Sequence, residues 1–365
     1  MINLLDLEYS ELDFLMQNLG EKSFRAKQIW QWIWQRCITD FPQMTNLSLA
    51  FRIKIADIAK CILPRLVSTQ SSHDGTKKLL LEFDDGAMVE TVIIPSKDHN
   101  GHIRIAQCLS SQIGCPMGCT FCSTGAMGFI RNMTAGEILS QILIVKKYLG
   151  DNIPGKPILR NLVFMGMGEP LLNLREVSKA INIANNPYGL AFTPRKVTIS
   201  TCGIKDGIEQ LGDSELAYLA VSLHAPNQNI RARIMPLAAK WNLEDMMATL
   251  ASYHLKSRER VTFEYLLLGG INDQPKHAYE LAKLINRTLG SDRAKINLIS
   301  YNPSIHPLLG LSTTPYRSPT DVDILQFEKI LRDKGITAIL RKSKGQDIKA
   351  ACGQLATGFK DKVNR

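Results

Sequence analysis

Apolar positions along the chain change their period twice, and these changes divide the 365 residues into three units and a tail. In residues 1–65, Ile29, Trp30, Ile33 and Trp34 recur at the i, i+3, i+4 spacing that places side chains on one face of a helix. An aromatic stripe at this spacing is more typical of a core than of a surface that stacks on bases. The pattern therefore predicts an N-terminal helical accessory domain with buried tryptophans, and RNA contact by the tryptophan face is the alternative.

Residues 66–100 alternate with period two. Two apolar runs, 77–83 and 88–94, flank the dipeptide Asp85-Gly86, which is typical of a tight hairpin turn. We expect a β-hairpin linker here. Glu90 stands inside the second run, where it either faces solvent or turns inward as a base, and the pattern leaves both open.

Strand and helix signals alternate through residues 101–340. Helical patterns begin near positions 134, 174, 243, 275 and 321, the first with a capping box formed by Thr134 and Glu137. Such alternation predicts parallel strands joined by right-handed helical crossovers. The expected fold class is α/β, a partial, TIM-like (β/α)6 barrel with the helical domain and the hairpin as extensions. The candidate strands are residues 104–109, 161–164, 196–200, 216–222, 261–267 and 294–299.

The carboxyl ends of these candidate strands carry small or polar residues. In β/α barrels the chemistry gathers at these ends. Glycines in the segment Met-Gly-Met-Gly-Glu-Pro at 165–170 let backbone approach a ligand closely, and Glu169 can accept from an amine or a hydroxyl. Together with the segments 200–203, 222–224 and 301–303, this predicts one pocket for a ligand with an amino-acid portion.

The chain is basic, with 44 Lys and Arg against 34 Asp and Glu and a formal net charge of +10. The excess is concentrated in a C-terminal tail, residues 341–365, which also contains Cys352. Positive charge favours polyanionic partners, although it also serves simple solubility. The N-terminus lacks the pattern of a secretory signal and no apolar run is long enough for a membrane span, so we expect a cytoplasmic protein without a membrane partner.

Three of the eight cysteines, Cys115, Cys119 and Cys122, have the spacing C-x3-C-x2-C. A [4Fe–4S] cluster held by three thiolates keeps one iron open for another ligand. The alternative is a structural zinc site completed by Cys108, but zinc sites usually combine two short Cys or His pairs and no second pair is present. A structural disulfide framework is less expected still, because disulfide-dense chains are small and secreted, whereas this chain has 365 residues and eight cysteines.

The cysteine spacing followed by the segment 165–170 resembles the radical S-adenosylmethionine (SAM) superfamily. Over essentially its whole length the chain resembles one family within it, the 23S ribosomal RNA adenine-C2 methyltransferases, RlmN. The segments that carry this resemblance are residues 24–28, 44–48, 90–95, 108–115, 121–124, 161–170, 222–225 and 350–355.

The resemblance implies two cofactors, a [4Fe–4S] cluster on Cys115, Cys119 and Cys122, and SAM, of which two molecules serve one turnover. In the family the open iron chelates SAM, which is then cleaved to a 5′-deoxyadenosyl radical. The positions that match the SAM contacts of the family are Gly168, Glu169, Ser200, Ser222, Leu223, His224 and Asn302.

The resemblance also implies the catalytic roles. Cys352 would carry the methyl group as S-methylcysteine, Glu90 would accept the C2 proton, and Cys108 would resolve the adduct through a transient disulfide with Cys352. The remaining cysteines, Cys37, Cys61 and Cys202, are expected to be small buried hydrophobes.

The implied partners are 23S rRNA, at an adenine of the peptidyl-transferase centre, and transfer RNA, at the adenine 3′ of the anticodon. A low-potential electron donor of the flavodoxin or ferredoxin type is also implied, and a monomer is the default. Two other functions stay open at this point. One is a sister enzyme that methylates adenine C8 and confers antibiotic resistance, and the other is a non-catalytic, zinc-bound RNA-binding protein.

Overall fold

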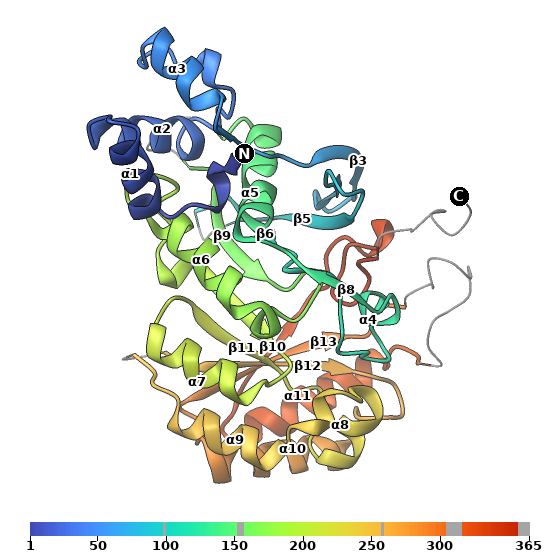
Figure 1. The fold of residues 1–365 in the computed structure, drawn as a ribbon. Helices are drawn as coiled ribbons and strands as arrows, with labels where there is room; N and C mark the ends of the chain where they lie inside the picture. Colours follow the sequence, from blue (N-terminus) through green and yellow to red (C-terminus); the bar gives the residue numbers. More distant parts are fainter. Residues whose placement is uncertain (98–99, 152–156, 257–258, 304–315, 357–365) are drawn as a thin grey trace.

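A ten-stranded sheet forms the centre of the computed structural model, which describes residues 1–97, 100–151, 157–256, 259–303 and 316–356 (Figure 1). The strands follow the order β14-β13-β12-β11-β10-β9-β6-β5-β4-β3 across the sheet. The sheet does not close on itself within these residues, since β3 and β14 are its two edges. The strand bounds are β3 (Arg65–Ser71), β4 (Lys77–Glu82), β5 (Met88–Lys97), β6 (Ile103–Cys108), β9 (Leu159–Phe164), β10 (Val197–Thr201), β11 (Tyr218–Ser222), β12 (Val261–Leu267), β13 (Ala294–Ser300) and β14 (Thr337–Arg341).

The half of the sheet from β6 to β14 is parallel. All six predicted strands are present in it, so the predicted α/β class with an open, partial barrel is confirmed. β14 is a seventh parallel strand that the prediction missed, and it lies across the expected boundary between core and tail at residue 340.

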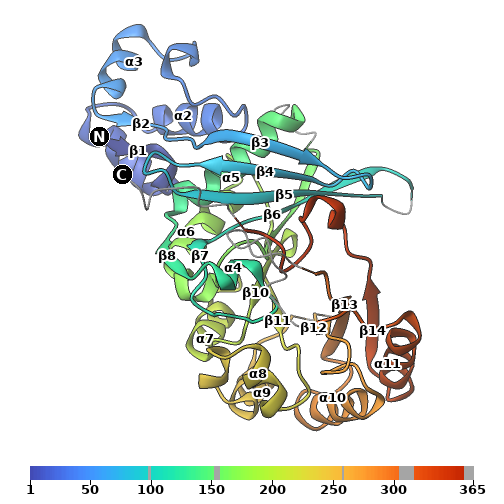
Figure 2. The same ribbon diagram turned by 90° about the vertical axis from the view of Figure 1, so that its right-hand side faces the viewer.

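Helices follow the parallel strands in sequence and lie along the outside of the sheet (Figures 1 and 2). The predicted capping box of α5 is confirmed, because Thr134 Oγ1 accepts from the Glu137 amide at 3.2 Å and the Glu137 carboxylate accepts from the Thr134 amide at 2.9 Å. The α-helices of this half are α4 (Ser123–Ala126), α5 (Ala135–Leu149), α6 (Leu174–Asn185), α7 (Lys205–Ser214), α8 (Gln228–Ile234), α9 (Leu243–Ser252), α10 (Pro275–Thr288) and α11 (Asp321–Asp333). Among the described residues, no helix is both long and apolar enough to cross a membrane.

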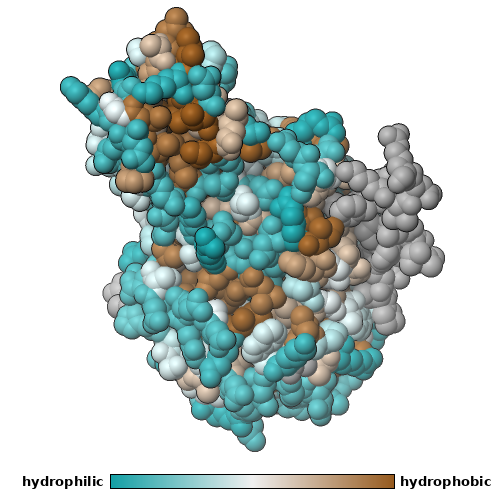
Figure 3. Space-filling view, viewed as in Figure 1, coloured by the Kyte–Doolittle hydropathy of each residue, from teal (hydrophilic) through white to brown (hydrophobic). Residues whose placement is uncertain are grey.

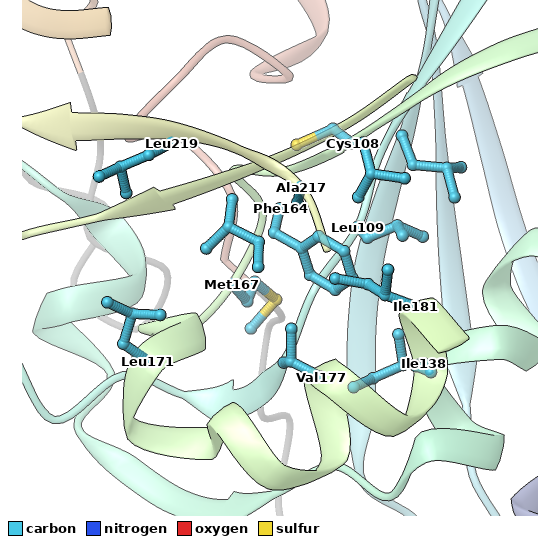
Figure 4. Close-up of a cluster of buried hydrophobic side chains, with 14 of the residues drawn as sticks. Cys108, Leu109, Ile138, Phe164, Met167, Leu171, Val177, Ile181, Ala217 and Leu219 are labelled. Atoms are coloured by element: carbon cyan, nitrogen blue, oxygen red, sulfur yellow. The ribbon is translucent and has the colours of Figure 1, made fainter. Parts of the chain in front are cut away.

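The core of this half lies between the sheet and its helices. In Figure 4, Ile138 of α5 and Val177 and Ile181 of α6 point toward the strands, where Phe164 of β9 meets them. All four side chains are buried. Cys108, at the end of β6, lies at the margin of the same cluster, so buried side chains pack against the end of this strand.

The predicted hairpin of residues 77–83 and 88–94 is confirmed as β4 and β5, which pair antiparallel. It is not isolated, because β5 also pairs antiparallel with β6 and β3 adds a third strand on the far side. The antiparallel strands therefore continue the main sheet (Figure 2). Every residue of β3 is exposed, and this explains why its sequence has no alternating pattern to reveal it.

The N-terminal unit packs three helices, α1 (Tyr9–Asn18), α2 (Phe24–Trp34) and α3 (Leu49–Ala56), beside a two-stranded sheet of β1 (Ile2–Asn3) and β2 (Ala59–Lys60). The tryptophan face of α2 is buried as predicted, with Trp30 and Trp34 fully inaccessible. Asp6 Oδ1 accepts a 2.6 Å hydrogen bond from the amide of Gly136, which joins this unit to the start of α5.

Apolar residues are visible on the surface of the N-terminal unit in Figure 3, whereas much of the remaining face is hydrophilic. The large exposed apolar side chains of this unit include Phe14, Phe24, Leu49 and Ile53. Short 3-10 helices complete the structure at Leu4–Asp6, Phe41–Gln43, Pro170–Asn173, Pro194–Lys196, Ala238–Lys240 and Gln346–Ile348.

Candidate active site

The three-cysteine segment is a loop between two short strands, β7 (Gln112–Gly114) and β8 (Phe129–Asn132), which pair antiparallel. The Cys115 amide donates to Gly128 O at 2.8 Å, and the Cys122 amide donates to Cys119 O at 3.1 Å. A Cβ at Gly125 would lie 2.9 Å from the Cys119 nitrogen, so only glycine lets the loop wrap this closely. These contacts hold the backbone of the loop that carries the three cysteines.

A cavity lies beside this loop, at the carboxyl ends of the parallel strands. Residues from the cysteine loop, from the ends of β9, β10 and β11, and from the C-terminal segment contribute to its wall. This is where the sequence predicted a ligand pocket. The expected site residues that line it are Cys115, Cys119, Cys122, Gly168, Glu169, Ser200, Ser222, His224 and Cys352.

The three loop thiols share an environment that fits a metal cluster. Burial raises the pKa of Cys115 to about 12 and also raises the pKa values of Cys119 and Cys122, and the sulfurs influence one another. Buried thiols become stable thiolates when a metal replaces their protons. Within the described part of the chain, no group of three His, Cys, Asp or Glu side chains is arranged around a point for a single metal ion. A [4Fe–4S] cluster, which binds each thiolate through a different iron, needs no such arrangement.

Glu169 joins the ends of β9 and β10 within the cavity wall. Its Oε1 accepts from the Leu171 amide at 3.0 Å and its Oε2 accepts from the Cys202 amide at 2.8 Å. Burial raises the pKa of this carboxyl, and the bond from Cys202 opposes the rise. Gly168 beside it has φ +103°, a backbone conformation that strongly favours glycine. The wall therefore offers a fixed carboxylate next to accessible backbone.

His224 presents a defined proton donor to the cavity. Its Nδ1 accepts from the Leu266 amide at 3.0 Å, so the neutral ring carries its proton on Nε2. Burial, with the nearby Arg231 charge, lowers the pKa of His224 to about 3, so the ring is neutral at physiological pH. Its backbone has φ +55°, and its ring meets Phe121 of the cysteine loop edge to face at 5.1 Å between centroids.

Two further expected SAM contacts lie outside this lining. Leu223 has a fully buried side chain, and its amide donates to Glu264 O at 3.0 Å. Asn302, after β13, is buried and its Oδ1 accepts from Gln346 Nε2. Its Nδ2 has no hydrogen-bond partner among the residues that the structure describes, which leaves one donor available for a ligand.

The segment that carries Cys352 is bonded directly to the cysteine loop. The Ser123 amide, next to Cys122, donates to Gly353 O at 2.7 Å, and Thr124 Oγ1 donates to Leu355 O at 2.6 Å. Cys352 lines the main cavity and also a second one, whose wall includes the basic residues Arg341, Lys342 and Lys344. Cys352 thus lies between the main cavity and a second, basic one.

Cys108 ends β6, outside the three-cysteine loop. It is buried, and burial, with a further electrostatic contribution from Cys352, raises the pKa of its thiol. Cys108 is not among the described residues that line the main cavity, whereas Cys352 and the three loop cysteines are.

Glu90 turns inward from β5, which answers the question that the strand pattern left open. The residue is 5% exposed, and its Oε1 lies 2.9 Å from Lys78 Nζ on β4. Its Oε2 accepts from the Ala356 amide at 2.9 Å, four residues beyond Cys352. Burial raises the pKa of Glu90, and the Lys78 charge opposes the rise.

The site contains a third buried carboxylate, in addition to Glu90 and Glu169, and the sequence reading missed it. Glu264 on β12 is 4% exposed and lines the main cavity, with Arg341 Nη1 at 3.5 Å and Asn297 Nδ2 donating to its Oε1 at 2.8 Å. Its Oε2 has no partner among the described residues. A carboxylate inside an apolar strand, the signal used for Glu90, would have identified it.

Other expectations for the cysteines and the tail have mixed outcomes. Cys37 and Cys202 are buried as expected, whereas Cys61 is only partly buried. The basic tail is described as far as residue 356, so its charges at Lys360, Lys362 and Arg365 lie outside the described residues.

Comparison with known proteins agrees with this arrangement. Residues 2–61 match the family described as the ribosomal RNA large subunit methyltransferase N-terminal domain, and residues 109–282 match the radical SAM superfamily. The dual-specificity RNA methyltransferase RlmN of Lawsonia intracellularis (strain PHE/MN1-00) is 58% identical over 360 residues, 98% of each chain. The protein of the same name from Nitratidesulfovibrio vulgaris (strain DP4) is 58% identical over 356 residues, 97% of this chain and 95% of the relative.

A solved structure shares the whole fold. The crystal structure of a radical SAM methyltransferase from Sphaerobacter thermophilus superposes with a TM-score of 0.87 at 36% identity, covering 97% of this chain and 99% of that one. Sequence identity over nearly the full length, both matched domains and the shared fold lead to the same conclusion. The chain belongs to the RlmN family of radical SAM RNA methyltransferases.

Proposed function

We propose that this chain methylates C2 of an adenine in 23S rRNA, at the peptidyl-transferase centre, and C2 of the adenine 3′ of the anticodon in some tRNAs, with Cys352 as the methyl carrier. The observation that carries the proposal is the position of Cys352, which lines one cavity with the three loop cysteines and a second cavity with three basic residues. A methyl carrier needs this double access, to the cosubstrate on one side and to RNA on the other.

Cys115, Cys119 and Cys122 would hold a [4Fe–4S] cluster as its three thiolate ligands. When bound, this group supplies the electron that cleaves the sulfonium of SAM into methionine and a 5′-deoxyadenosyl radical. Their shared cavity wall and loop geometry support this assignment. The residues that we assign to SAM binding are Gly168, Glu169, Ser200, Ser222, Leu223, His224 and Asn302.

Cys352 acts first as a nucleophile. Its thiolate attacks the methyl carbon of one SAM, the new sulfur–carbon bond forms, and the sulfonium–methyl electron pair leaves with S-adenosylhomocysteine. Desolvation by the surrounding protein raises the pKa of the Cys352 thiol. The Arg341 charge opposes that rise and so favours the thiolate. The result is S-methylcysteine at position 352.

The second half of the cycle transfers this methyl group to RNA. A second bound SAM would supply the radical chemistry that removes one hydrogen from the methyl group on Cys352, and the methylene carbon of Cys352 would then bond to C2 of the adenine. Glu90 accepts the C2 proton, and the surplus electron of the adduct leaves to the electron carrier.

We assign Cys108 as the residue that resolves the covalent adduct between Cys352 and RNA. Its thiolate attacks the Cys352 sulfur, a disulfide forms, and the sulfur–methylene bond breaks with its electron pair on carbon, which takes a proton from solvent. Two electrons from a low-potential donor of the flavodoxin or ferredoxin type then reduce the disulfide. The burial of Cys108 and the electrostatic influence of Cys352 on its thiol support this pairing. We assign the protein as a monomer.

The competing product is C8-methyladenine. The match of residues 2–61 to the ribosomal RNA methyltransferase N-terminal domain, and the printed name of the relatives, support the dual-specificity C2 assignment. The test is nucleoside mass spectrometry of 23S rRNA and tRNA after reaction with the reconstituted enzyme, against C2-methyl and C8-methyl adenosine standards. C2-methyladenosine in both RNAs is expected, and C8-methyladenosine alone would refute the proposal.

A further inference from the structure

Lys78 is a buried lysine with two contacts that converge on the Cys352 segment. It is 8% exposed, and its Nζ lies 2.9 Å from Glu90 Oε1. The same Nζ donates to the backbone carbonyl of Lys349 at 3.2 Å. A buried ammonium must keep such partners, since desolvation without them is costly.

The two contacts hold the Cys352 segment from both ends. Lys349, bonded by Lys78, lies three residues before Cys352, and Ala356, bonded by Glu90 Oε2 at 2.9 Å, lies four residues after it. The ion pair of Lys78 on β4 and Glu90 on β5 therefore bonds to the chain on both sides of Cys352, the proposed methyl carrier. The turn between β3 and β4 bonds to the chain further upstream, where the Gly345 amide donates to Asp74 Oδ2 at 2.9 Å and Ser72 Oγ donates to Asp347 Oδ1 at 2.6 Å.

Resting on the proposed function, we propose that Lys78 is a positioning residue that orients the Glu90 carboxylate toward the Cys352 segment and ties that segment to β4. Lys78 touches neither cosubstrate nor target base in this role. It acts through Glu90 and through the Lys349 carbonyl.

Removal of Lys78 would change both of its partners. Glu90 would keep its burial but lose the cation that favours its charged form, and a protonated carboxyl cannot accept the C2 proton. Lys78 on β4 is the charged group in direct contact with the Glu90 carboxylate, and the Ala356 amide is the other hydrogen-bond partner of that carboxylate. Loss of the Lys349 contact would also remove one of the bonds that hold the start of the segment.

The neighbouring lysine provides a matched control. Side chains alternate along a strand, so Lys77 points to the opposite face of β4. Its Nζ donates to the Tyr148 hydroxyl at 3.2 Å and lies 4.9 Å from the centre of that ring. Lys77→Met removes the same charge from the same strand without touching Glu90.

The experiment compares Lys78→Met, Lys78→Arg, Lys77→Met and Glu90→Gln by two readouts. The first is hydrogen exchange of residues 349–356 in the full chain without RNA. The second is the rate at which the covalent protein–RNA adduct of the reconstituted enzyme is resolved, as a function of pH. Lys78→Gln, which keeps a donor without the charge, serves if Lys78→Met does not fold.

We expect Lys78→Met to speed exchange of the segment and to slow adduct resolution on the order of tenfold or more near pH 7, within the range of general-base effects. Rising pH restores the rate in Lys78→Met, because Glu90 then loses its proton, but does not restore it in Glu90→Gln. Lys78→Arg should resolve the adduct at a rate close to that of the wild type, because it keeps the charge. Lys77→Met should match the wild type in both the rate of adduct resolution and the exchange of the segment.

The proposal is overturned if Lys78→Met or Lys78→Gln resolves the adduct at the wild-type rate at every pH. This holds even if hydrogen exchange of residues 349–356 is faster in that variant. Normal resolution by Glu90→Gln would instead remove Glu90 from the proposed function. The two failures are thus distinguishable.

Discussion

The backbone amide of Ala356 donates a 2.9 Å hydrogen bond to the carboxylate of Glu90. The group proposed to accept the C2 proton therefore also holds the segment that carries the proposed methyl carrier. A target adenine whose C2 proton is to reach this carboxylate would lie beside the Ala356 amide and the segment that carries Cys352.

Cys115→Ala is expected to abolish assembly of the iron–sulfur cluster, because two thiolates remain where three are needed. Anaerobic reconstitution followed by visible absorption and iron analysis measures this. Cys61→Ala is the control, since Cys61 lies outside the cavity lining and burial raises the pKa of its thiol to about 12. A Cys115→Ala protein that retains a full complement of iron would contradict the assignment.

Cys108→Ala is expected to form the RNA adduct but not to release it, because no thiolate can attack the Cys352 sulfur. Denaturing electrophoresis with labelled RNA should show a covalent protein–RNA species that persists, whereas the wild type resolves it. Cys37→Ala is a matched control, because Cys37 is a buried cysteine that does not belong to the described lining of the main cavity. Free methylated RNA from Cys108→Ala at the wild-type rate would remove the resolving role.

The sequence predicted the parallel strands and the place of the site because both follow from local patterns. Apolar runs such as residues 261–267 show a buried strand, and polar residues at strand ends converge wherever parallel strands share an edge. β14 was not predicted from the sequence because it is an edge strand and four of its five residues are exposed. Its composition therefore lacks the signal of a buried parallel strand.

The roles of Lys78 and Glu264 could not be predicted from local patterns. Lys78 contacts Lys349, 271 positions away, and Glu264 contacts Arg341 across two strands of the sheet. Such pairs arise from the register of the folded sheet, which periodicity does not report. The inward turn of Glu90 was likewise undecided until its partner across β4 was known.

His224→Asn is expected to reduce the pH dependence of stability. The pKa of His224 is lowered from 6.5 to about 3 in the folded protein, so between these values the unfolded chain binds a proton that the folded chain excludes. The free energy of unfolding then falls as pH falls, by about 1.4 kcal/mol per unit below 6.5, or about 2 kcal/mol between roughly pH 7.5 and pH 5.

Urea unfolding of both proteins at the two pH values measures this contribution. Asparagine tolerates the positive φ of this position, which limits backbone strain in the variant. The wild-type advantage over the variant should shrink by about 2 kcal/mol on acidification. An equal loss in both proteins would show that His224 is protonated in the folded state.

Trp30→Ala is expected to destabilise the N-terminal unit by about 3–5 kcal/mol, the usual cost of removing a buried aromatic ring. Trp30 is 0% exposed, and its ring contacts Tyr9 edge to face with centroids 5.4 Å apart. Phe14→Ala, at a position that is 64% exposed, should change stability by less than about 0.5 kcal/mol. Equal effects in thermal unfolding would mean that the tryptophan face does not form the core of this unit.

The central claim is that Cys352 carries the methyl group. Peptide mass spectrometry of the protein produced with cluster and SAM tests it directly, with Cys108 as the internal comparison in the same digest. We predict one added methyl group on the Cys352 peptide, and its absence when Cys119 is replaced by alanine. Unmodified Cys352 in cluster-loaded protein exposed to SAM would contradict the account.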